Sequence, residues 1–303
     1  MPQDKYTRGA FLHLPGVGPG KISAFPAQGI HEWNHLRAKH ATPHLPGVPP
    51  TRAAELLAEI ERCEDALSKK NLAYLSQKLH RSDHWRLLAD FGESATYLDI
   101  ETSGDDLHPE ITLIIAKHRG CIHTFTAERN LGGFLDLVNE IELLVTFNGA
   151  SFDVPQLENH FHIPLRDIAH VDLRWACYHA QLRGGLKDIE RAIGLIRPAD
   201  LIGMDGAEAA FLWQRWKATG NEKMLRRLTR YCTADVIGLE HLSRWIIASH
   251  TSQPFPEFHW RDLPEEHSIT MQAIENTGSL EKAGLESRLR SRVRALRREV
   301  AHE

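Results

Sequence analysis

The chain has 303 residues, of which 42% are hydrophobic and 25% are charged, and its formal net charge is −4. This length suffices for one large domain with extensions, or for two domains, and the composition is that expected of an ordinary soluble protein. Because the net charge is slightly negative, composition alone does not indicate a nucleic-acid-binding protein. A prediction of nucleic-acid binding must therefore rest on local basic segments of the sequence.

The sequence also does not indicate a membrane protein, a secreted protein or a zinc-binding protein. No apolar run is long enough to span a bilayer, and the first residues lack the pattern of a signal peptide. The cysteines contain no Cys-x-x-Cys pair, so neither a zinc site nor a disulfide framework is indicated. We therefore expect a cytoplasmic protein that does not bind membranes. The four cysteines are Cys63, Cys121, Cys177 and Cys232.

Near the N-terminus, Phe11–Ile22 contains Gly16-Val17-Gly18 and is typical of the hairpin in a helix-hairpin-helix element. Backbone N–H groups at such a helix start can bind a phosphate. A structural loop packed on the rest of the protein is an equal alternative. Residues 44–48 repeat the sequence of residues 13–17 but are followed by Pro49-Pro50, so the second glycine, Gly18 in the first copy, is lost.

Residues 50–88 have an apolar stripe at helical spacing, formed by Ala53, Leu56, Leu57 and Ile60. We expect them to form a small helical layer that leads into the first strand. Together with the hairpin segment they make up a predicted helical N-terminal region, residues 1–90.

The first acidic motif is Asp99-Ile100-Glu101. It lies in a predicted strand that begins with β-favouring residues and is followed by turn-forming residues. Side chains two residues apart on a strand point to the same face, so Asp99 and Glu101 lie side by side while Leu98 and Ile100 face the core. Two adjacent carboxylates repel each other unless a cation lies between them. The motif therefore predicts a cation site on a strand.

Residues 91–250 are predicted to form an α/β domain with a mixed sheet flanked by helices. The first three strands are joined by short turns and should be antiparallel, whereas the last two are reached through helices. The predicted strands are Ala95–Glu101, Ile111–Lys117, Cys121–Thr126, Glu142–Asn148 and Ala169–Leu173.

The second acidic motif follows the fourth predicted strand, which Asn148-Gly149 ends. Pro155 suits the first turn of a helix that begins near Asp153, so Asp153 stands where a strand passes into a helix. Asp172 also ends a strand, but it has no partner at an informative spacing, and we rank it below Asp153.

The third motif, Tyr231 to Asp235, lies in residues 221–249, where apolar side chains recur at nearly helical period. Tyr231 and Asp235 are one turn apart and share a face of this helix. The carboxylate can bind a cation, and the phenol, which titrates near pH ~10, is suited to orient a water molecule rather than to deprotonate it.

After residue 250 the sequence changes character. Residues 251–303 begin with a proline-rich linker, and residues 285–300 place leucine and valine on one face of a helix with arginines over the rest. This basic amphipathic helix could follow a phosphate backbone, dock on the body of the protein, or pair with another subunit.

Taken singly, each acidic residue is most simply a turn or cap residue. Together, Asp99, Glu101, Asp153 and Asp235 predict a site for two divalent cations. Hard carboxylate oxygens suit Mg²⁺ or Mn²⁺, and two such ions can hold the attacking and leaving oxygens of a phosphodiester hydrolysis.

The three motifs in this order resemble the DEDD superfamily of 3′→5′ exonucleases, which have a ribonuclease-H-like fold. The resemblance covers residues 94–248. Tyr231 at its spacing resembles the DEDDy branch, because the sister branch carries a histidine where this chain has Arg230. Thr102 and Gly185–Glu190 are similar to a bacterial subgroup of uncharacterised ribonuclease-H-like proteins.

The resemblance implies a role for each residue. It implies that Asp99 bridges both cations, that Glu101 and Asp235 complete the site of the attacking water, and that Tyr231 orients this water. Asp153 would support the second cation. Two further residues, Thr102 and Asn148, would touch the terminal nucleotide of the substrate, although turn and cap roles are equal alternatives for them.

The predicted function is therefore a metal-dependent 3′→5′ exonuclease that acts on single strands or 3′ ends of DNA or RNA. Two alternatives stay open. One is a nucleic-acid-binding protein with an inactive nuclease fold, which four intact acids disfavour. The other is a structure-directed endonuclease whose substrate the hairpin segment and the basic tail select.

Overall fold

The computed structural model describes residues 4–40, 50–104, 109–266 and 269. The repeat at residues 44–48 and the basic helix at residues 285–300 lie outside these residues, so both remain predictions. No helix within the described ranges is long and apolar enough to cross a membrane.

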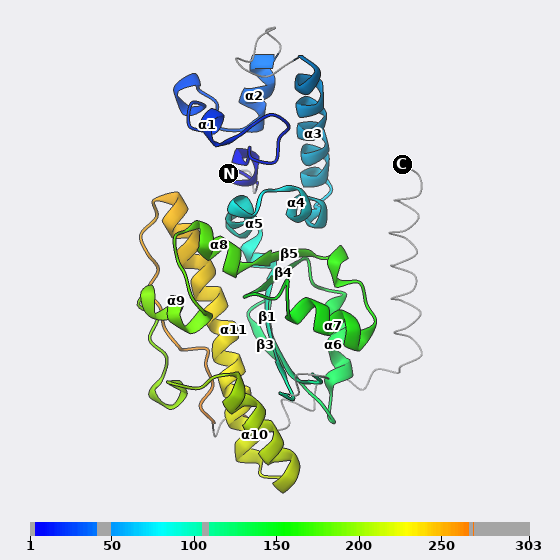
Figure 1. Cartoon of the computed structure of the whole chain (residues 1–303), viewed down its shortest axis with the longest axis vertical. Coiled ribbons are helices and arrows are strands. Elements are labelled where there is room, and N and C mark those ends of the chain that lie inside the picture. The colour runs from blue at the N-terminus through cyan, green and yellow to red at the C-terminus, as the bar shows by residue number, and fades with distance from the viewer. Residues whose placement is uncertain (1–3, 41–49, 105–108, 267–268, 270–303) are drawn as a thin grey trace.

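Residues 4–40 and 50–94 form a helical layer at one end of the molecule (Figure 1). The helices expected over residues 50–88 are present, and they lead directly into the first strand. The elements of this layer are η1 (Thr7–Gly9), α1 (Pro19–Ile22), η2 (Pro26–Gln28), α2 (Trp33–His40), α3 (Pro50–Ser68), α4 (Leu72–Lys78), η3 (Arg81–Asp83), α5 (His84–Phe91) and η4 (Gly92–Ser94).

The predicted hairpin segment packs its apolar side chains into this layer. Leu14 and Val17 are buried, and the indole of Trp33 donates a 2.5 Å hydrogen bond to the carbonyl of Ala10. Helix α1 begins after Gly18 and has only one turn. The segment is therefore anchored to the helical layer, and its phosphate-binding role remains a prediction.

The central sheet has five strands in the order β3-β2-β1-β4-β5. The first three strands pair as antiparallel neighbours, and β4 and β5 run parallel to β1. The predicted mixed sheet is thus confirmed, with β4 and β5 shorter than expected. The strands are β1 (Ala95–Thr102), β2 (Ile111–His118), β3 (Cys121–Thr126), β4 (Leu143–Thr146) and β5 (Ala169–Asp172).

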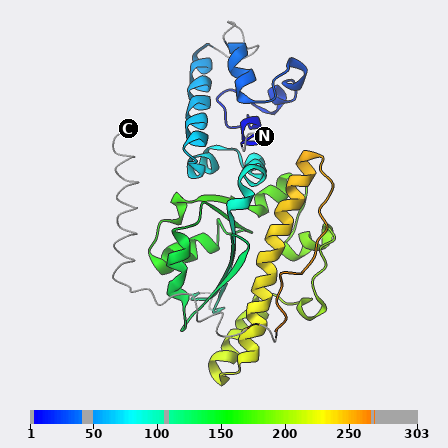
Figure 2. The same ribbon diagram turned by 180° about the vertical axis from the view of Figure 1, so that it is seen from behind.

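Helices cover both faces of the sheet, which lies between α11 and the pair α6 and α7 (Figures 1 and 2). Side chains alternate along the strands, so Leu98 and Ile100 join one apolar core while Tyr97 joins the other. The remaining elements are η5 (Leu131–Gly133), α6 (Phe134–Val138), α7 (Asp153–Phe161), η6 (Leu165–Asp167), α8 (Leu173–His179), α9 (Leu186–Ala192), η7 (Ala199–Leu201), α10 (Gly206–Thr219) and α11 (Glu222–Thr251).

The register of the sheet determines which side chains meet. Tyr97 pairs with Val145, which pairs with Val171, so the carboxyl ends of β1, β4 and β5 lie at one edge. Asp99 follows Tyr97 by two residues on β1, and α8 begins at Leu173, directly after β5. Asp99 and Glu101 lie on the same face as Tyr97, which is the face that α11 covers.

Candidate metal centre

Asp99 and Glu101 on β1 meet α11 at Cys232. The carboxylate oxygens of both acids and Sγ of Cys232 all lie within 4.8 Å of one another. Sγ lies 3.2 Å from Oδ2 of Asp99, and burial, followed by the charges of Asp99 and Glu101, raises the pKa of the thiol well above its usual range. In the metal-free protein Cys232 is therefore a protonated hydrogen-bond donor to Asp99.

The other two predicted acids reach the same place from different elements. Asp153 is the first residue of α7, and Asp235 lies on α11; both are buried. Burial raises the pKa of Asp99 well above its usual range, and the charges of Asp235, Asp153 and Glu101 raise it further. The fold thus brings the four carboxylates, hereafter the acidic cluster, into one poorly solvated region.

The charged form of Asp153 is likewise destabilised by burial and by neighbouring carboxylates. Burial raises its pKa to about 7, and Asp172 and Asp235 add to the rise, whereas the backbone N–H groups of Asp153 and Ile100 oppose it by hydrogen bonding to the carboxylate. The pKa of Glu101 is also raised, first by burial and then by Asp235, while Lys187 opposes the rise.

These properties fit divalent cations. Carboxylates that are buried together are destabilised by repulsion and desolvation, and a hard cation relieves both. The donor set consists of carboxylate oxygens, which suit Mg²⁺ or Mn²⁺. The residues of the acidic cluster could therefore hold such ions, as the sequence predicts.

A cation of the protein already contacts the cluster. Nη2 of Arg197 donates a 2.5 Å hydrogen bond to Oδ1 of Asp235, and the same guanidinium forms a two-bond ion pair with Glu190 at 2.6 and 2.8 Å. All three side chains are buried. Sequence reasoning assigned no role to Arg197 or Glu190, because neither lies within one of the acidic motifs.

Helix α11 approaches this ion pair through a glycine. A Cβ atom at Gly238 would lie 2.2 Å from Oε1 of Glu190. Gly238 is the single glycine between residues 221 and 249, and this was the signal that could have revealed the contact. The missing side chain leaves room for Glu190 to reach Arg197.

Tyr231 lies one turn before Asp235 and is buried. Burial raises the pKa of its phenol, and the charges of Asp235, Glu101 and Asp99 raise it further. Lys187 on α9 donates a hydrogen bond to the phenol oxygen, and its ammonium lies 4.5 Å from the centre of the ring. The phenol therefore stays protonated and is held in place.

The weaker predicted residues have structural partners. Asp172 accepts hydrogen bonds from the backbone N–H groups of Asn148, Ala150 and Arg174 at 2.7, 3.1 and 3.0 Å, which makes it a cap, in keeping with its lower rank. The side-chain oxygen of Asn148 accepts a 2.5 Å hydrogen bond from Arg174. Thr102 ends β1 beside a register shift. Substrate contacts of Asn148 and Thr102 remain predictions.

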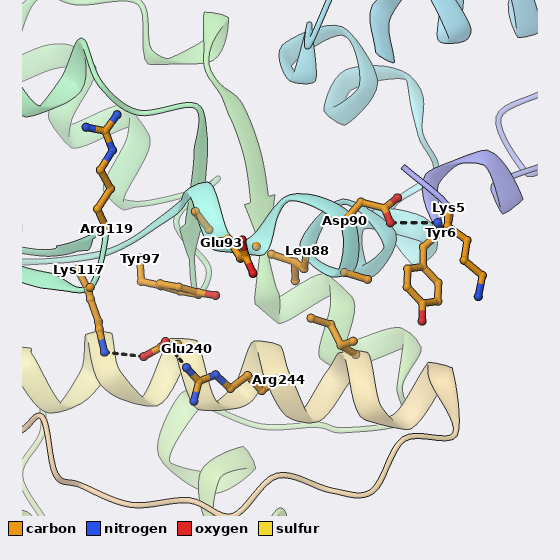
Figure 3. A pocket seen from close by; sticks show the side chains of 15 residues that line it. Lys5, Tyr6, Leu88, Asp90, Glu93, Tyr97, Lys117, Arg119, Glu240 and Arg244 are labelled. Atoms are coloured by element: carbon orange, nitrogen blue, oxygen red, sulfur yellow. Dashed lines mark hydrogen bonds and ion pairs between the residues drawn. The ribbon is translucent and has the colours of Figure 1, made fainter. Parts of the chain in front are cut away.

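Two hollows flank these elements. A pocket of about 480 Å³ is lined by α9 and the segment up to Met204, and Lys187, Glu190 and Arg197 belong to its wall. A pocket of about 650 Å³ lies between the helical layer, β1 and α11 (Figure 3). Lys117 and Arg244 in this second pocket pair with Glu240 at 2.7 and 2.6 Å, and no residue of the acidic cluster lines it.

Comparison with known proteins places these features in context. A family model of the RNase_H superfamily matches residues 96–247, which include the whole acidic cluster and Tyr231. Among curated proteins, none matches the chain. Among solved structures, the chain is similar to the family B DNA polymerase of the hyperthermophilic archaeon Pyrobaculum calidifontis, with 20% identity and a TM-score of 0.39. That similarity covers 52% of this chain and 24% of the polymerase.

Proposed function

Because this chain belongs to the RNase_H superfamily, we propose that it is a metal-dependent 3′→5′ exonuclease that hydrolyses phosphodiester bonds of DNA or RNA. Membership supports a nuclease function. The observation that carries the finer proposal is the convergence of carboxylates from β1, α7 and α11 beside a buried tyrosine. The strand and helix patterns of Asp99, Glu101, Tyr231 and Asp235 support the 3′→5′ direction through their resemblance to DEDD exonucleases.

In this proposal Asp99, Glu101, Asp153 and Asp235 hold two Mg²⁺ or Mn²⁺ ions. Such ions, when bound, stabilise negative charge on phosphate oxygens and lower the pKa of water. Asp99 lies among the other three carboxylates, since each of them acts on its pKa, and this suits a ligand shared by both ions.

In this proposal, residues of the protein orient the attacking water and the carboxylate of Asp235. The protonated phenol of Tyr231 would hydrogen bond to the attacking water and fix its direction of approach. Lys187 fixes the phenol, and Arg197 holds one oxygen of Asp235 so that the other is left for a cation. Lys187 and Arg197 are therefore positioning residues in this proposal.

The test is a cleavage assay with 5′-end-labelled oligonucleotides of DNA and RNA, single-stranded and duplex, in Mn²⁺. A ladder that shortens stepwise from the 3′ end supports the proposal. Internal cuts would instead indicate a structure-directed endonuclease, and binding without cleavage an inactive nuclease fold. Asp99→Asn serves as the inactive variant, and Glu93→Gln, an exposed carboxylate outside the acidic cluster, as its matched control.

A further inference from the structure

Helix α8 carries two large aromatic side chains that the fold leaves exposed. Trp175 and Tyr178 are 38% and 48% exposed. They are three residues apart on a helix and so share a face, and their ring centres lie 6.1 Å from each other. Buried neighbours on the same helix, Ala176 and Cys177, attach α8 to the core, so the exposed face is not needed for packing.

One arginine lies over each of these two rings. The guanidinium of Arg81 lies 4.7 Å from the ring centre of Trp175, and that of Arg183 lies 3.8 Å from the ring centre of Tyr178. Arg174 is exposed on the same helix. Among the described residues, no carboxylate pairs with any of these three arginines. We call Arg81, Arg174, Trp175, Tyr178 and Arg183 the arginine–aromatic surface.

This surface borders the acidic cluster. Helix α8 begins directly after β5, which β4 separates from β1, so β1 and β5 lie two strand spacings, roughly 10 Å, apart. The charge of Asp172, which precedes α8, acts on the pKa of Asp153 in the acidic cluster. Asp172 and Arg174 bind the loop around Asn148 that leads to Asp153. The arginine–aromatic surface and the acidic cluster are therefore linked through this loop.

We propose that the arginine–aromatic surface binds single-stranded nucleic acid, by stacking bases on Trp175 and Tyr178 and pairing phosphates with its arginines. Exposed aromatic rings beside guanidinium groups are what single strands need, because every base has a stacking face and every linkage a negative charge. In a duplex the bases are already stacked on each other, so the surface would discriminate against it. The choice of occupant rests on the proposed nuclease function.

The arginine–aromatic surface also includes a residue of the helical layer. Arg81 lies in η3, outside residues 96–247 that match the superfamily model, and η3 packs against α8. The layer therefore contributes a side chain to the surface next to Trp175. Substrate length and strandedness would depend on it, whereas the acidic cluster lies wholly within the matched residues.

The test measures binding separately from cleavage. Fluorescence anisotropy in EDTA would give the affinity of the full chain for labelled single-stranded and duplex oligonucleotides. We expect Trp175→Ala and Tyr178→Ala each to weaken single-strand binding by about 5-fold to 150-fold, with much less effect on duplex. Arg81→Gln and Arg183→Gln should each reduce the dependence of log affinity on log salt by ~0.7 for every phosphate that the arginine pairs with.

Two controls match these variants. Phe255→Ala removes another exposed ring, one that is already stacked on Trp245, and Arg119→Gln removes an exposed arginine that pairs with Glu140. Neither should change single-strand affinity. Circular dichroism would verify that all variants are folded.

The outcomes separate this inference from the proposed function. Unchanged affinity in Trp175→Ala and Tyr178→Ala overturns the inference even if the wild-type protein is an exonuclease. Loss of affinity in both variants supports it even if no substrate is cleaved, in which case only the proposed nuclease function fails. Unchanged binding with an altered oligomeric state would show a protein–protein interface and would also overturn it.

Discussion

Arg197 and Asp235 form a buried hydrogen-bonded ion pair with an Nη2–Oδ1 distance of 2.5 Å. Glu190 holds the guanidinium from its other side, and all three side chains are at most 7% exposed. The metal-free acidic cluster therefore has an internal counter-charge. Removing one partner of a buried pair leaves an uncompensated charge, which typically costs about 3–5 kcal/mol.

Arg197→Met should lower the free energy of unfolding of the metal-free protein by this amount, and Mn²⁺ should restore part of the loss because it supplies positive charge at Asp235. Chemical denaturation with and without Mn²⁺ measures both effects. Lys117→Met is the matched control, since Lys117 is a buried cation between Glu240 and Asp262. An equal response of both variants to Mn²⁺ would contradict the role of Arg197 at the acidic cluster.

Asp99→Asn should abolish cleavage and leave the protein folded. Because burial and three neighbouring carboxylates destabilise the charge of Asp99, its removal should raise the stability of the metal-free protein, on the order of 1 kcal/mol. A cleavage assay in saturating Mg²⁺ and a denaturation curve in EDTA are the two measurements. Turnover near that of the wild type would rule out the acidic cluster as the catalytic centre.

Tyr231→Phe should reduce kcat by roughly 10²-fold and leave Mn²⁺ affinity unchanged, because the phenol orients water and does not bind the cation. Titration calorimetry measures the affinity. Tyr74→Phe, which removes a phenol that donates to Glu59 in the helical layer, is the control and should keep full activity. A large fall in Mn²⁺ affinity of Tyr231→Phe would mean that the phenol supports the carboxylates instead.

The carboxyl group of Asp153 should make the metal-free protein lose stability as the pH rises from about 4 to about 7, whereas buried histidines with lowered pKa values, such as His13 and His170, act in the opposite direction. Burial raises the pKa of Asp153 to about 7, whereas a carboxyl group in the unfolded chain titrates near ~3.9, so the folded state binds more protons between these values. The loss should be on the order of a few kcal/mol and smaller in Mn²⁺. Denaturation of the wild-type protein and of Asp153→Asn at pH 5 and pH 8 in EDTA tests this, because the difference in unfolding free energy between the two proteins should shift in favour of the variant at pH 8.

Much of the fold could be predicted because it follows from local patterns. The alternation of Leu98 and Ile100 with Asp99 and Glu101 defines a strand with one polar side, and short turns between consecutive strands require antiparallel pairing. The helical period around Tyr231 and Asp235 likewise defines a long helix, observed as α11. The limits of β4 and β5 were less accurate, since strand ends depend on pairing with neighbours.

The candidate site was likewise predictable only in part. The acidic residues could be predicted from the sequence alone, because Asp99 and Glu101 share a face of a strand, and Tyr231 and Asp235 share a face of a helix. Their partners depend on the tertiary structure. Arg197 lies 38 residues from Asp235, and Lys187 lies 44 residues from Tyr231.

Cys232 shows why contacts between distant residues could not be predicted from the sequence. It lies next to Tyr231 in the chain, yet its thiol meets Asp99, 133 residues away, only because α11 packs across the face of β1. Trp175 likewise meets Arg81 through the packing of η3 on α8. Periodicity determines which face a side chain occupies, but whether that face meets a charge, a ring or solvent depends on how distant elements pack together.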